Sequence, residues 1–204
     1  MKKAVSFFIF TFCFSGFAFA DDCLSHKVSP TVEVIRPEWT VEAMQPSESM
    51  DALHGTVAAT FEEEYNLSVA SEPLDAGYCV VLRSVRASVG YTDFLVRIDA
   101  SHIPGSCGYD MTMEHEEEHI TAHIAALDGE YASIEKTIET AANSIMPVFV
   151  KSLDGVDAVL DKMQSDLQND PGIILMKQKL DVQQEIGNKK VDEHDDGKRI
   201  NSCK

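Results

Sequence analysis

Residues 114–123 read EHEEEHITAH and contain the H-E-x-x-H pattern at His115, Glu116 and His119. On a helix, residues four apart lie on one face, so both imidazoles can reach a single ion. Neutral histidine nitrogens bind zinc, and a neighbouring carboxylate can take a proton from a water molecule. The spacing therefore predicts a zinc site with His115 and His119 as ligands and Glu116 as general base. The alternative interpretation is a solvated acidic helix whose histidines bind nothing.

A helical projection divides this segment into three strips. The first strip is apolar, the second is acidic, and the third places small side chains next to the histidines. The apolar strip contains Met113, Ile120, Ile124 and Leu127, and the acidic strip contains Glu114 and Glu118. The third strip contains His115, His119, Ala122 and Ala126. A simple surface helix does not need the third strip. Its small residues leave room for another element to approach, as a buried site requires.

The third zinc ligand is expected from outside the pattern. On a straight helix His123 lies about 12 Å along the axis from His115, too far for both to bind one ion together with His119. We therefore place His123 beside the site or on the surface. His102 and Asp110, which precede the H-E-x-x-H pattern, are possible ligands from outside this part of the helix.

A chain reversal would supply a different third ligand. Asp128-Gly129 favours a turn, because glycine in a helix interior costs about 1 kcal/mol relative to alanine. After a reversal there, Glu139 would lie opposite His119, so Glu139 is the predicted third ligand. If the helix continues through Gly129, Glu139 points elsewhere.

The first 20 residues have the features of a secretory signal peptide, with cleavage expected after Ala20. Lys2 and Lys3 precede an apolar segment, and no second apolar span follows. We therefore expect a periplasmic or secreted protein without a membrane span after signal removal. The formal net charge is −17 at pH 7, which repels nucleic acid and anionic lipid, so no nucleic-acid partner is expected.

Four cysteines remain after the signal peptide: Cys23, Cys79, Cys107 and Cys203. An even count in an exported protein predicts two disulfides. Of the three possible pairings we favour Cys79 with Cys107, which would join a strand to the loop before the histidine helix, and Cys23 with Cys203. The alternative is that cysteines bind the metal, but none has the C-x-x-C spacing of a zinc knuckle.

The remaining sequence predicts an α+β fold. Residues 78–89 and 92–100 read as two antiparallel strands around a turn at Val89-Gly90-Tyr91, and residues 31–35 read as a short strand. Helical spacing resumes in residues 130–151, 153–167 and 173–186, and the composition is polar from Gly187 onward. The predicted architecture is a small antiparallel sheet packed on the H-E-x-x-H helix, followed by a C-terminal helical region.

Residues 79–127 carry a cysteine, two strands around a turn, Pro-Gly-Ser-Cys at 104–107 and then the H-E-x-x-H pattern. This order resembles secreted bacterial zinc metallopeptidases of an uncharacterised, zincin-like family. The resemblance implies zinc on His115 and His119 and Glu116 as general base, in a minimal zincin-like domain. We assign residues 1–20 to the signal peptide, 21–150 to that domain, 151–187 to a helical extension packed on it, and 188–204 to a polar tail.

Two functions compete on this basis. The first is an exported zinc-dependent metallopeptidase that hydrolyses a peptide or protein substrate through zinc-activated water, with Tyr131, Tyr109 or His102 steadying the oxyanion. The second is a non-catalytic binding or structural module of the envelope, in which the His/Glu helix only captures metal. Replacing Glu116 by Gln separates them, because only an enzyme would lose turnover while it keeps its metal.

Overall fold

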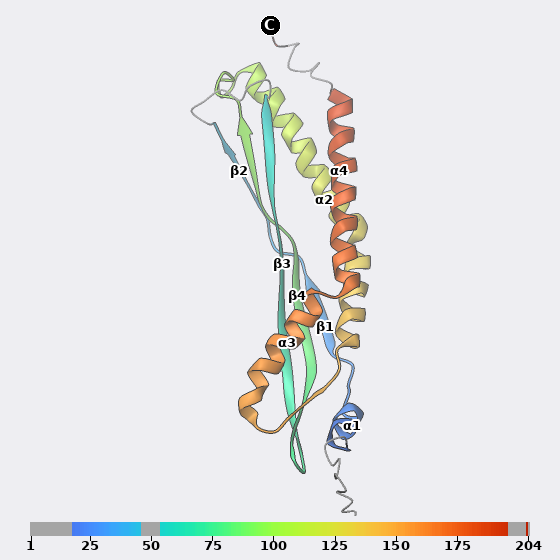
Figure 1. Cartoon of the computed structure of the whole chain (residues 1–204). Helices are drawn as coiled ribbons and strands as arrows, with labels where there is room; N and C mark the ends of the chain where they lie inside the picture. Colours follow the sequence, from blue (N-terminus) through green and yellow to red (C-terminus); the bar gives the residue numbers. More distant parts are fainter. Residues whose placement is uncertain (1–17, 46–53, 196–202, 204) are drawn as a thin grey trace, which may run out of the picture.

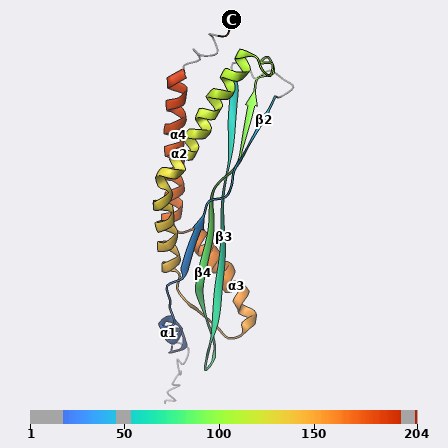
Figure 2. The same cartoon turned by 180° about the vertical axis from the view of Figure 1, so that it is seen from behind.

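The computed structural model describes residues 18–45, 54–195 and 203. The first described element is a short helix, α1 (Ala18–Ser25). The signal peptide expected over residues 1–20 therefore lies outside the described residues, apart from residues 18–20. The molecule is elongated, because a long β-hairpin lies beside two long helices, as both views show (Figures 1 and 2).

The hairpin consists of β3 (Gly55–Leu74) and β4 (Gly77–Ile98). The two strands pair antiparallel from Leu74 opposite Gly77 at the tip to Gly55 opposite Ile98 at the far end. At about 3.3 Å per residue, β4 extends over about 70 Å. The turn expected at Val89-Gly90-Tyr91 is wrong, because both strands predicted around it belong to β4.

The sequence of β4 explains why this single strand has the pattern of two. Its core-facing residues alternate regularly except at two places where the spacing increases from two residues to three. These residues are Val80, Leu82, Val85, Ala87, Val89, Tyr91, Phe94, Val96 and Ile98. The pairing with β3 shifts at the same two places, where Arg83 and Thr92 are the extra residues of β-bulges. A bulge restores the inward phase without reversing the chain.

The sheet is mixed, so the expected antiparallel sheet is wrong. β1 (Thr31–Ile35) and β2 (Thr40–Met44) both pair parallel with β4, whereas β5 (Val148–Val150) pairs antiparallel with it. Since β4 does not fold back, its second edge stays open along its length and takes these three short strands in succession. The link between β1 and β2 lies close to β4, since a Cβ at Gly90 would be 2.9 Å from Pro37 Cδ.

The H-E-x-x-H pattern lies on α2 (Cys107–Ser144), a helix of 38 residues. Ser106 caps its start by accepting a hydrogen bond from the Tyr109 backbone N–H. The helix continues through Gly129, so the turn expected at Asp128-Gly129 is wrong. Gly129 is exposed, and the burial of Leu127 before it and Ile134 after it on the same core outweighs its modest cost.

The C-terminal region is helical, as expected. The short turn η1 (Leu153–Gly155) leads into α3 (Val156–Gln168), and α4 (Pro171–Asp195) follows. Helix α4 passes through Gly187 without a break, so residues 188–195, which we expected in a polar tail, are helical. Among the helices within residues 18–45 and 54–195, none combines the length and apolar composition of a membrane span.

Helices α2 and α4 run antiparallel against each other (Figure 1). Lys179 Nζ lies 2.6 Å from Glu130 Oε2, and further along α4 a Cβ at Gly187 would lie 3.2 Å from Ala122 Cβ. Later residues of α4 therefore contact earlier residues of α2. Residues beyond Gly187 are carried toward the histidines of α2.

The main core lies between the hairpin and the helices α2, α3 and α4. The helices bury against the inward face of β4 the side chains of Leu127, Ile134, Ile138, Val159, Met163, Leu167, Ile173, Met176 and Leu180. A smaller cluster of Cys23, Cys79 and Val81 covers the other face of the hairpin near its tip, with Ala70, Leu74 and Phe149 packed on it. The hairpin is therefore covered on both faces at Cys79–Leu82, close to its tip.

Two disulfides are present, as predicted, but the favoured pairings are wrong. Cys23 bonds to Cys79, and Cys107 bonds to Cys203. Cys79 lies near the hairpin tip, whereas Cys107 begins α2 after the opposite end of β4. Some 60 Å of extended strand separates these two ends, so a bond between Cys79 and Cys107 is impossible.

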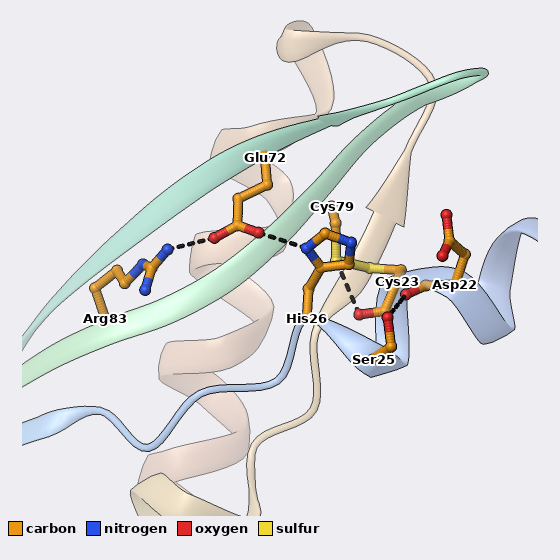
Figure 3. Close-up of a disulfide and its surroundings, with 7 residues drawn as sticks. All are labelled: Asp22, Cys23, Ser25, His26, Glu72, Cys79 and Arg83. Carbon is orange, nitrogen blue, oxygen red and sulfur yellow. Dashed lines mark hydrogen bonds and ion pairs between the residues drawn. A yellow bond between two sulfur atoms is a disulfide. The ribbon is translucent and has the colours of Figure 1, made fainter.

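The bond between Cys23 and Cys79 fastens α1 to the hairpin (Figure 3). Beside it, Glu72 of β3 lies between His26 and Arg83 and contacts both side chains, with His26 Nδ1 2.5 Å from Glu72 Oε2. Arg83 is the extra residue of one β-bulge. His26, which follows α1, is thus held to β3, and the pair of Arg83 and Glu72 links β3 to β4.

Candidate metal centre

The structure brings together His115 and His119 of α2 with Asp192 of α4. One ligand atom from each, the two Nε2 atoms and Asp192 Oδ1, lie within 4.8 Å of one another. The two Nε2 atoms are 3.1 Å apart, and Asp192 Oδ1 lies 3.2 Å from His119 Nε2 and 3.7 Å from His115 Nε2. The three residues form a group that could hold a metal ion.

These separations fit a tetrahedral ion. Zinc binds imidazole nitrogen at about 2.0–2.1 Å and carboxylate oxygen at about 2.0–2.2 Å, so ligand atoms around a tetrahedron lie about 3.3–3.5 Å apart. The three observed separations lie on either side of this value. The Asp192 side chain is 65% exposed, whereas those of His115 and His119 are 17% and 10% exposed. The group therefore borders solvent, and water can reach it.

The small residues beside the histidines of α2 allow α4 to pack closely on this helix. Gly187 has no side chain, and a Cβ at its position would lie 3.2 Å from Ala122 Cβ and 3.7 Å from the Ala122 carbonyl oxygen. The two helices can approach closely here because both residues are small. One turn further along α4, Asp192 is then carried to His115 and His119. The expectation that small residues beside the histidines admit another element is confirmed.

Glu116 is buried on the face of α2 that packs on the start of β3. Only 3% of the residue is exposed, and a Cβ at Gly55 would lie 2.7 Å from Glu116 Oε1 and 2.5 Å from Thr112 Cγ2. Glycine at position 55 therefore makes room for the carboxyl group. Burial raises the pKa of Glu116 to about 7; the nearby His119 opposes this rise and Asp192 adds to it. A carboxyl group with this pKa can both take and give a proton near neutral pH.

A row of polar side chains extends from the group toward the sheet. His119 Nδ1 lies 3.1 Å from Asn188 Oδ1, and Asn188 Nδ2 lies 3.3 Å from His123 Nε2. His123 Nδ1 in turn lies 3.1 Å from the hydroxyl oxygen of Tyr91 on β4. Burial, followed by the nearby His119, lowers the pKa of His123. His123 is therefore connected to the ligand group through Asn188. Because its pKa is lowered, it stays neutral at physiological pH.

The predicted third ligand, Glu139, lies away from this group. Because α2 does not reverse, Glu139 is 20 residues beyond His119, about 30 Å along the same helix, and its side chain is exposed. Asp192 stands where Glu139 was expected. The physical reason is that the element returning along the histidines is α4 and not the second half of α2.

The other candidate residues lie outside the ligand group. His102 Nε2 lies 3.0 Å from His54 Nδ1 and its ring packs against Gly108. Asp110 is exposed in the first turn of α2. The Tyr131 hydroxyl donates to the Val34 carbonyl, and Tyr109 packs on the core. None of these four belongs to the ligand group.

Sequence reasoning missed Asn188 and Asp192, although a signal for them exists. The buried positions Met176 and Leu180 of α4 are followed at helical spacing by the half-buried Gly187 and Val191. This continuation predicts that the helix and its inward stripe extend beyond Gly187. Asn188 and Asp192 border that stripe four residues apart, the same spacing as His115 and His119.

The arrangement offers two imidazoles, one carboxylate and an open side, next to a buried carboxyl group that titrates near neutral pH. This donor set suits zinc, and the open side leaves room for a water molecule. Comparisons of the chain with protein families, with curated proteins and with solved structures found no match.

Proposed function

We propose that the protein is an exported zinc-dependent metallopeptidase. The observation that carries the proposal is the convergence of His115, His119 and Asp192 at tetrahedral separations next to the buried Glu116. Two disulfides are typical of proteins that fold outside the cytoplasm, which supports the periplasmic or secreted location.

Each residue has a distinct role in the proposed reaction. His115, His119 and Asp192 would hold the ion, and the exposed Asp192 lies on the solvent side of the group. A bound zinc would supply a Lewis acid to activate water and polarise the peptide carbonyl. Glu116 accepts the proton released from the attacking water and returns it to the leaving amine. Its pKa of about 7 suits both transfers.

The proposal is tested with the variant Glu116→Gln. The zinc-loaded protein and the variant are incubated with a library of quenched fluorescent peptides, and zinc content is measured on the same samples. We expect Glu116→Gln to keep about one zinc per chain while cleavage falls by about 10²- to 10⁴-fold. Glu117→Gln is the matched control, because Glu117 is the exposed neighbour on the same helix. Equal cleavage by Glu116→Gln and the unaltered protein would remove Glu116 as the base.

A second candidate function has support from the origin of the ligands. Two come from α2 and one from α4, so an ion would cross-link the helices, and Cys107–Cys203 fastens the chain beyond α4 to the first residue of α2. In this function the ion is structural and the protein is a binding or structural module of the envelope. One zinc per chain without cleavage of any peptide in the library would favour it over the metallopeptidase.

A further inference from the structure

We propose that Asn188 is a positioning residue that fixes the tautomer of His119 and so presents the Nε2 lone pair of His119 to the ion. This inference rests on the proposed metal site. The Asn188 side chain contacts the candidate ligand group at His119, and it lies on the same helix as Asp192. One helix face therefore brings both a ligand and the group that orients another ligand.

The geometry places the Asn188 amide between two imidazoles. Its Oδ1 is 3.1 Å from His119 Nδ1, and its Nδ2 is 3.3 Å from His123 Nε2. An amide oxygen only accepts and an amide nitrogen only donates. His119 must then carry its proton on Nδ1, and His123 must present a lone pair at Nε2.

The next residue in the row is compatible with the same sense. With its Nε2 accepting, a neutral His123 carries its proton on Nδ1 and donates to the Tyr91 hydroxyl oxygen 3.1 Å away. Tyr91 also hydrogen-bonds to the Gln184 side chain of α4. The row from His119 to Tyr91 therefore has a consistent direction of donation, and the amide is held by partners on both sides.

The opposite sense would prevent metal binding. With the amide rotated, Asn188 Nδ2 would donate to His119 Nδ1, and the proton of neutral His119 would have to sit on Nε2. That proton would point at Asp192 Oδ1, 3.2 Å away, and would occupy the lone pair that the ion needs. Outer partners that orient metal-bound histidines in this way typically contribute 10- to 100-fold to metal affinity.

Three variants test the role. Asn188→Leu removes both polar groups at similar size, whereas Asn188→Asp keeps an acceptor for His119 Nδ1–H. Gln183→Leu is the control, because Gln183 is an exposed amide on the same helix. Zinc affinity is measured by competition with a chromophoric chelator, and far-UV circular dichroism verifies that each variant is folded.

We expect Asn188→Leu to weaken zinc binding by about 10- to 100-fold, and Asn188→Asp and Gln183→Leu to bind within a few-fold of the unaltered protein. Recovery by Asp separates orientation of His119 from simple packing, since both variants change the side chain. Unchanged zinc affinity in folded Asn188→Leu would overturn the proposal.

A second readout does not require zinc. Nitrogen-15 NMR of the metal-free protein, at a pH where imidazoles are neutral, shows which ring nitrogen of His119 carries the proton. We expect Nδ1 in the unaltered protein and in Asn188→Asp, and a mixture of tautomers in Asn188→Leu. A proton on Nε2 in the unaltered protein would overturn the role of Asn188. Absence of zinc binding with the expected tautomer would instead overturn the metal site, while the orientation of His119 by Asn188 would stand.

Discussion

The two ends of the α2–α4 pair differ in what holds them together. At one end, Ile134 and Ile138 of α2 and Ile173, Met176 and Leu180 of α4 are buried in the common core. At the other end, the helices meet through the polar group of His115, His119, Asn188 and Asp192, with Gly187 against Ala122. Apolar burial stabilises the first end, whereas the proposed metal site would let a bound cation stabilise the second end.

The largest effect on stability is expected at the apolar end. Ile138→Ala should lower the free energy of unfolding by about 2–5 kcal/mol, because Ile138 is fully buried and its truncation leaves a cavity in the core. Zinc affinity of the folded fraction should not change. Urea unfolding and chelator competition measure the two quantities, and the exposed neighbour Glu139→Ala is the control. Loss of zinc affinity in Ile138→Ala would show that the two ends do not act independently.

The two disulfides are expected to differ in their effect on zinc binding. Removing either pair as a double Cys→Ala variant should cost about 2–4 kcal/mol, because each closes a long loop, of 56 residues for Cys23–Cys79 and 96 for Cys107–Cys203. Only the loss of Cys107–Cys203 should also weaken zinc binding, since this bond fastens the chain beyond α4 near the polar end. Equal zinc affinity in both double variants would contradict this difference.

A smaller effect is expected from pH in the metal-free protein. The pKa of Glu116 is about 7 in the folded state against an ordinary value of 4.5, so the native state binds this proton more tightly than the unfolded state. Its contribution is complete below about pH 4.5 and is lost as pH rises to about 7, amounting to at most about 3 kcal/mol. Denaturant unfolding in the presence of a chelator should show this decline, and Glu116→Gln should reduce it. The same slope in both proteins would mean that Glu116 is not the titrating group.

The sequence could predict the half of the site that lies on one helix. His115 and His119 share a face because of a local spacing, and the small residue Ala122 marks where another helix approaches. The third residue of the group could not be found in this way, because Asp192 is 73 positions away from His119. Its placement depends on α2 passing through Gly129, and a local propensity of about 1 kcal/mol pointed to the opposite outcome.

The sequence predicted helices and strands, but not how the strands are connected and paired. The alternation in β4 correctly indicated strands, but its change of phase after Tyr91 has two physical solutions, a turn or a β-bulge. The predicted pair of strands in residues 78–100, and with it a bond between Cys79 and Cys107, requires a turn at this place, whereas the structure has a β-bulge. The long open edge of β4, which recruits β1 and β2 in parallel, is a property of the assembled hairpin and not of any short segment.

The most direct test of the metal centre is the zinc affinity of Asp192→Asn, compared with Glu193→Gln and Glu139→Gln. Glu193 is the exposed acidic neighbour of Asp192, and Glu139 is the acidic residue that a reversed helix would have used. If His115, His119 and Asp192 hold the ion, the unaltered protein binds one zinc per chain. Asp192→Asn should then lower the zinc affinity by more than about 100-fold, because losing an outer partner typically costs only about 10- to 100-fold. Both glutamate variants should bind as the unaltered protein does. Unchanged zinc affinity in Asp192→Asn, or no zinc bound by the unaltered protein, would contradict the assignment of this metal centre.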